Sequence, residues 1–192
     1  MTFFPSLPEG AGPPAVFAQY PEIYRPWSEM SEALMNGPSS IDRGERELLL
    51  AFAAGVVGCD FVAVAHAEVA YAWGIEHGLV ERLLDDPDLA AAGARLQPVL
   101  RYLRTLMLAP DALDQSSADA VFDQGWDEQA LHDAIAIAGR AAFMRCLTQG
   151  HGFVPPSREV AARHARRRVE RGYVNLYSVF RPGTSTVGPD AR

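Results

Sequence analysis

Three residues whose types can do acid–base and sulfur chemistry stand in one short stretch: Glu47, Cys59 and His66. A carboxylate, a thiol and an imidazole are the groups that carry nucleophilic and proton-transfer steps in many enzymes. If the stretch forms two helices that meet near Gly58, Cys59 lies close to the start of the second helix. Unpaired backbone N–H groups and the helix dipole favour a thiolate there. Positions 59, 62 and 66 have the spacing of one helix face, so we expect Cys59 and His66 to face one pocket with Glu47 as a proton relay.

Each of these residues also has an ordinary structural interpretation. A free cysteine is often a small buried apolar residue, a lone histidine often bonds a core carbonyl, and a glutamate usually lies on a helix surface. The apolar run Leu48–Leu50 after Glu47 predicts a helix buried nearly all round, so its carboxylate should be partly desolvated. Together the three favour a functional pocket. They are also ligand types for zinc or iron, but without a second cluster of such residues we expect neither a metal nor a cofactor.

The elements that must position these residues are predicted to be helices, because apolar residues recur at helical spacing and no β-alternation persists. Asp42 and Glu45 form a capping-box pattern that opens a helix to about residue 57. Pro21 and Pro26 are expected to break a helical segment over 15–36. Further helices are predicted at about 59–73, 78–85, 89–108, 127–149 and 157–171, with a short one after 114–117. The fold class is therefore all-α, with an N-terminal arm and helical segment over 1–36, a main domain over 37–175 and a loose tail over 176–192.

Composition limits the partners of the chain. It has 192 residues, a formal net charge of -7, 48% hydrophobic and 21% charged residues, as in globular proteins. The negative charge argues against nucleic acid or a membrane as partner. A basic cluster is expected to be a solvated helix face rather than an anion-binding patch: Arg163, Arg166, Arg167, Arg168 and Arg171. No secretory leader and no apolar run of ~18 residues is found, so we expect a cytoplasmic location and reduced cysteines.

The run from Glu47 to His66 resembles the alkylhydroperoxidase D-like branch of the carboxymuconolactone decarboxylase superfamily. The motif of that branch is a glutamate, a Cys-x-x-Cys pair and a histidine, and Glu47, Cys59 and His66 occupy its first, second and fourth places. The element over 123–131 and the long helix over 140–152 also look like that branch. The likeness covers about 40–152, and the N-terminal arm is similar to that of an uncharacterised peroxidase-related subgroup.

One position departs from the family pattern. Val62 stands where the second cysteine of the pair is expected, and in the family that sulfur is usually assigned the attack on peroxide. No local disulfide can therefore form at Cys59. Cys146, in an apolar part of the long helix, is expected in the core. It would resolve an oxidised Cys59 only if that helix packs on the pocket.

The resemblance implies an alkylhydroperoxidase D-like helical bundle that assembles as a homo-oligomer. It also implies a peroxidase-related antioxidant oxidoreductase: Cys59 attacks a peroxide, Glu47 and His66 relay the proton, and an external thiol reduces the sulfenic acid. The alternative enzyme is a decarboxylase-like lyase or isomerase in which His66 and Glu47 do acid–base work on a small organic acid. The third alternative is a degenerate, non-catalytic member of the family.

Overall fold

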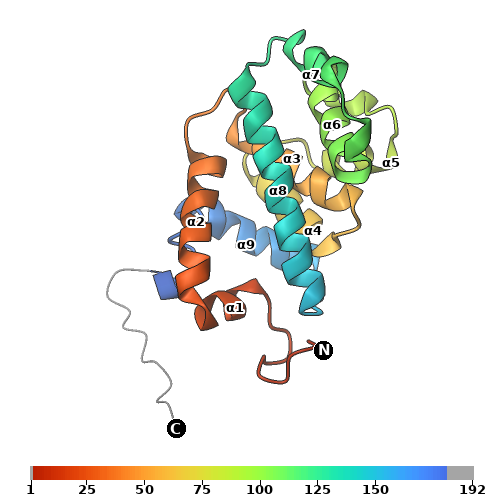
Figure 1. The fold of residues 1–192 in the computed structure, drawn as a ribbon. Coiled ribbons are helices and arrows are strands. Elements are labelled where there is room, and N and C mark those ends of the chain that lie inside the picture. Colours follow the sequence, from red (N-terminus) through yellow and green to blue (C-terminus); the bar gives the residue numbers. More distant parts are fainter. Residues whose placement is uncertain (1, 181–192) are drawn as a thin grey trace.

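The computed structural model describes residues 2–180 of the chain, and within them every regular element is a helix (Figure 1). The all-α prediction is thereby confirmed for the described residues. The α-helices are α1 (Pro13–Gln19), α2 (Pro21–Asn36), α3 (Arg43–Val56), α4 (Asp60–Ala72), α5 (Leu79–Asp85), α6 (Gly93–Leu108), α7 (Gln115–Phe122), α8 (Glu128–Gly150) and α9 (Arg158–Arg171). The described residues also form three short 3-10 helices: η1 (Ala90–Ala92), η2 (Pro110–Ala112) and η3 (Ser178–Phe180).

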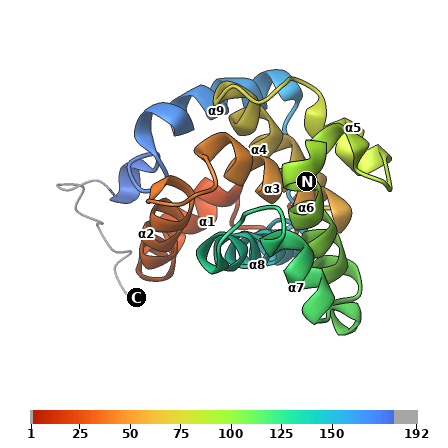
Figure 2. The ribbon, with the colours of Figure 1, turned by 90° about the horizontal axis from the view of Figure 1, so that it is seen from above.

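Helix α3 is the centre of the molecule. It packs against α4, α6 and α8, and Figure 2 shows it enclosed between these neighbours. Every residue from Gly44 to Ala54 is buried, which fits the apolar sequence of this segment. Because a fully enclosed helix has no solvent face, any polar group on it must find a partner inside the protein.

The α3–α4 hairpin forms where local sequence signals place it. The Asp42 carboxylate accepts a hydrogen bond from the backbone N–H of Glu45, and the Glu45 carboxylate accepts one from the backbone N–H of Asp42, so the capping box opens α3 as predicted. The chain reverses at Gly58, whose φ of 69° lies in the left-handed region that favours glycine. Cys59 follows as the N-cap of α4, close to the helix start as expected.

Two expectations for prolines and helix starts need correction. Pro26 lies inside α2 and does not break it. The fixed φ of proline is compatible with a helix, although the ring removes the hydrogen bond to the carbonyl four residues earlier. The helix expected from residue 89 begins at Gly93 instead. Leu89 has a φ of 57°, and the residues after it form η1, so the α-helix cannot start there.

Helices from the N-terminal and C-terminal parts of the described chain both pack around the α3–α4 hairpin. Helix α9 packs along α4, while α2 packs against α8 and α3 (Figures 1 and 2). Of the tail expected over 176–192, residues 181–192 lie outside the described part of the chain. None of the described helices is both long and apolar enough to cross a bilayer.

Candidate functional site

A hydrogen-bonded Glu–His pair lies between α3 and α4. Nδ1 of His66 is 2.6 Å from Oε2 of Glu47. Both side chains are almost completely buried, with 2% of Glu47 and 4% of His66 exposed. The desolvated carboxylate that the apolar neighbours of Glu47 predicted is therefore present, and its partner is the predicted histidine.

Tyr173 is the second hydrogen-bond partner of the Glu47 carboxylate. Its hydroxyl donates to Oε1 of Glu47 over 2.5 Å, so both carboxylate oxygens have a partner. Tyr173 reaches this position because α9 ends at Gly172, where φ is 70°, and because the Glu32 carboxylate accepts a hydrogen bond from the Tyr173 N–H. Tyr173 could not be identified as a site residue from the sequence, since nothing in its local sequence distinguishes it from a core tyrosine.

Burial sets the protonation of this cluster. It lowers the pKa of His66 to about 4, even though Glu47 acts to raise it. Burial alone would raise the pKa of Glu47, but interactions with His66, Arg168 and Tyr173 hold that pKa below its ordinary value. At neutral pH the pair is thus a carboxylate bonded to the Nδ1–H of a neutral imidazole. Nε2 of His66 is then left with a free electron pair, which is what a general base requires.

Two arginines stand beside this pair, and sequence reasoning missed both roles. Arg140 of α8 is 3% exposed, and its guanidinium lies 4.7 Å from the ring centre of Tyr173. Arg168 of α9 is half-buried and lies over the same ring at 4.6 Å. The basic cluster of α9 was expected to face solvent; that holds for its other members, which are exposed, but not for Arg168. A charged residue in an otherwise apolar stretch of α8 was the available signal for Arg140.

A cavity of about 670 Å³ opens beside His66. Its walls come from α4, α8, α9, the N-terminal segment before and within α1, and residues 176–179. Val62 and His66 line it from α4, with Phe61, Val69 and Met144 among the apolar side chains. This volume is in the usual range for small-molecule sites.

Cys59 is placed differently from the expectation that it shares a face with His66. As the N-cap of α4 it has φ -99° and ψ 75°, outside the helical range, so the helix-face argument does not apply to its side chain. Its Sγ lies 3.5 Å from Oγ1 of Thr148 on α8, and 1% of the residue is exposed. Cys59 is not among the residues that line the cavity.

The second cysteine also differs from its expectation. Cys146 was expected in the core, but it is exposed, because it lies on the outer face of α8 while Met144 and Leu147 point inward. Both cysteines are free thiols. Within residues 2–180, no three His, Cys, Asp or Glu side chains come together as a metal site would require.

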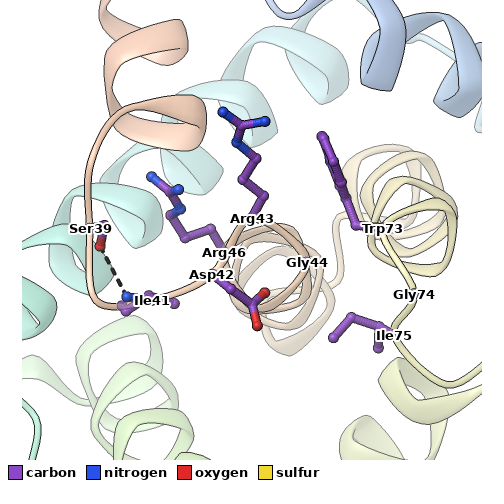
Figure 3. Close-up of a pocket in the computed structure, with 9 residues that line it drawn as sticks. All are labelled: Ser39, Ile41, Asp42, Arg43, Gly44, Arg46, Trp73, Gly74 and Ile75. Carbon is purple, nitrogen blue, oxygen red and sulfur yellow. Dashed lines mark hydrogen bonds between the residues drawn. The ribbon is translucent and has the colours of Figure 1, made fainter.

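A second, shallower pocket lies at the start of α3, away from the Glu–His pair. Figure 3 shows Arg43, Arg46 and Trp73 on its wall. Arg46 donates to the carbonyl oxygens of Leu34 and Gly37 at 2.8 and 2.9 Å, so it joins the end of α2 to α3. Arg43 and Arg46 stabilise the connection between α2 and α3 through hydrogen bonds to main-chain carbonyls. Neither Glu47 nor His66 lines this pocket.

The comparisons with known proteins give the fold. No family model matches the chain, and no curated protein is similar enough to count as a match. Among solved structures, an uncharacterized peroxidase-related protein from Silicibacter sp. TM1040 matches with a TM-score of 0.68 and 18% identity, covering 75% of each chain. An uncharacterized peroxidase-related protein from Ralstonia eutropha JMP134, described as an alkylhydroperoxidase AhpD core, matches with a TM-score of 0.65 and 16% identity, covering 78% of this chain and 80% of the other. The chain therefore has the all-helical alkylhydroperoxidase-core fold that its motif predicted.

Proposed function

We propose that this protein is an acid–base enzyme in which His66 moves a proton to or from a small organic molecule bound in the 670 Å³ cavity. The observation that carries the proposal is the buried Glu47–His66 hydrogen bond at a residue that lines the cavity. Reactions of the decarboxylase-like lyase or isomerase class need such a group, because they remove or add a proton at carbon.

The assignment of roles follows from the contacts. Glu47 accepts the Nδ1–H of His66 and fixes the ring orientation and tautomer, while Tyr173 holds the other carboxylate oxygen. Nε2 of His66 takes the proton, and the developing imidazolium is stabilised by the adjacent carboxylate. The low pKa of His66 keeps the base unprotonated at neutral pH.

Exchange of substrate protons with solvent tests this proposal without knowledge of the product. Small 2-oxo and 3-oxo carboxylic acids are incubated with the protein in D₂O, and loss of the carbon-bound proton signal is followed by NMR. We expect His66→Gln to slow enzyme-dependent exchange by a factor of about 10² to 10⁴. Cys59→Ser should leave the rate nearly unchanged. If His66→Gln exchanges as fast as the wild type, or if no acid exchanges, the proposal fails.

Peroxide reduction is the second candidate, and two observations favour it. The solved structures that match are described as peroxidase-related, and Cys59, a free thiol, is the N-cap residue of α4. In this reaction His66 accepts the proton of the Cys59 thiol, and the thiolate attacks the peroxide oxygen and breaks the O–O bond. The alcohol or water leaves with the proton from His66, and two external thiols reduce the sulfenic acid, releasing water and a disulfide. The burial of Cys59 away from the cavity lining makes this the weaker candidate.

Val62→Cys tests whether the cavity can support peroxide chemistry. Val62 lines the cavity, so this change adds a thiol beside His66 and restores the Cys-x-x-Cys spacing with Cys59. If the cavity admits peroxides, Val62→Cys should consume alkyl hydroperoxide with a dithiol faster than the wild type. The double variant Val62→Cys with Cys59→Ser should lose most of that gain. No gain, in a protein that forms the 59–62 disulfide, would rule out the peroxidase candidate.

A further inference from the structure

The cavity has a charge pattern opposite to that of the whole protein. The chain has a net charge of -7, yet no aspartate or glutamate is among the described residues that line the cavity. Its arginine and histidine lining residues are Arg140, Arg167, Arg168, Arg171, His66 and His164. An acidic protein with a cavity lined by cations would concentrate anions there.

Arg140 is a buried cation with unused donors. Its Nε donates to Oγ of Ser31 over 3.1 Å, and its guanidinium lies between the rings of Trp27 and Tyr173, at 4.9 and 4.7 Å from their centres. Its Nη1 is buried and has no hydrogen-bond partner among the described residues. Because a buried unpaired donor is costly, especially on a charged group, this arrangement points to an absent acceptor.

The charges of the cluster do not balance. Arg140 and Arg168 contribute two positive charges, Glu47 contributes one negative charge, and His66 is neutral because burial lowers its pKa to about 4. Both oxygens of Glu47 are already engaged by His66 and Tyr173. Within residues 2–180, neither guanidinium forms an ion pair with a carboxylate. Among Arg140, Arg168, Glu47 and His66, one positive charge is therefore left without a carboxylate to balance it.

We infer that the cavity binds an organic monocarboxylate, with its carboxylate on Arg140 and Arg168 and its apolar body along Phe61, Val69 and Met144. One negative charge neutralises the cluster, and a planar carboxylate matches the guanidinium fork. The apolar part of the lining gives the rest of the ligand a surface to bury. The inference names the substrate class for the proposed function, but the binding itself does not require proton transfer.

Binding of octanoate tests this inference, with octanol, octylamine and inorganic phosphate as matched probes. Octanol and octylamine keep the apolar chain without the anion, and phosphate keeps an anion without the chain. Calorimetric titration of the wild type should show octanoate binding at least about tenfold tighter than each of the other three. Equal binding of octanoate and octanol, tighter binding of phosphate, or no binding of octanoate would overturn the inference.

Variants locate the site. Arg140→Gln and Arg168→Gln should each weaken octanoate binding about tenfold or more, while octanol binding changes little. Arg166→Gln is the matched control, because Arg166 is exposed on α9 and does not line the cavity. If Arg140→Gln does not fold, Arg168→Gln and the wild-type octanoate-to-octanol ratio decide. Octanoate binding that survives both substitutions in folded protein contradicts the inference.

The same titration separates this inference from the proposed function. His66→Gln should bind octanoate like the wild type while losing proton exchange. If octanoate binds selectively but no acid exchanges its protons with any form of the protein, the carboxylate site is supported and the acid–base proposal fails. If acids exchange their protons but octanoate binds no more tightly than octanol, the acid–base proposal is supported and the carboxylate site fails.

Discussion

Arg46 and Arg140 are both 3% exposed, and each has a side-chain nitrogen that is buried without a hydrogen-bond partner among the described residues. Their surroundings differ. Arg46 donates to two main-chain carbonyls at the end of α2, and Asp133 lies near enough to favour its charge. Arg140 has one hydroxyl acceptor, two aromatic rings and a cavity without acidic residues. A single unpaired nitrogen therefore does not indicate a ligand, but an uncompensated charge beside a cavity does.

The largest expected difference between these two regions is in stability. Arg46→Met leaves the carbonyls of Leu34 and Gly37 without their donor, so the free energy of unfolding should fall by about 3 kcal/mol. Arg140→Met replaces a buried cation that has no ion pair by an apolar side chain of similar length, so stability should change by less than about 1 kcal/mol. Urea unfolding followed by circular dichroism measures both. Equal losses would mean that Arg140 is as structural as Arg46.

The pH dependence of stability tests the protonation state of His66, which lines the cavity. The pKa of His66 is about 4 in the folded protein and near 6.5 when unfolded, so the unfolded state binds a proton more readily. Stability should therefore fall as the pH decreases from about 6.5 to about 4, and His66→Gln should remove this part of the loss. The rate of proton exchange should hold down to about pH 5 and then fall. A wild-type curve that matches His66→Gln across this window would contradict the buried neutral imidazole.

Tyr173→Phe separates the carboxylate from its second donor. The hydroxyl donates to Oε1 of Glu47, and its loss leaves a buried carboxylate oxygen unpaired, which should cost about 1–2 kcal/mol of stability. The pKa of Glu47 should rise toward its ordinary value, because one of the interactions that lowers it is removed. Tyr20→Phe is the control, since Tyr20 is exposed. Infrared detection of the Glu47 carboxylate during acid titration measures the shift.

The smallest expected effect is in the reactivity of the two thiols. The labelling rates show whether the cavity extends as far as Cys59. Cys146 is exposed and Cys59 is 1% exposed, so a thiol reagent should modify Cys146 quickly and Cys59 only after unfolding. Cys146→Ser gives a protein in which only Cys59 can report. Fast labelling of Cys59 in that folded variant would show that the cavity reaches the thiol, and it would revive the peroxidase candidate.

Local signals predicted the elements that carry the first half of the site. The Asp42–Glu45 capping box, the reversal at Gly58 and the apolar run after Glu47 place α3 and α4 side by side, which brings Glu47 to His66. These features act over a few residues, so they can be identified without knowledge of the rest of the chain. Cys59 lies at the start of α4 as expected, but as the N-cap it leaves the helical register, and it is not among the residues that line the cavity.

What the sequence alone determined is an all-helical chain with a buried carboxylate and an imidazole in one hairpin. What only the tertiary structure decided is the rest of the site. Arg140, Arg168 and Tyr173 come from α8, α9 and the turn after α9, and the packing of α9 on α4 brings them together. Helical periodicity shows which residues share a face, but not which neighbour covers that face. For that reason the cationic cavity could not be predicted from the basic cluster, although its arginines were visible from the start.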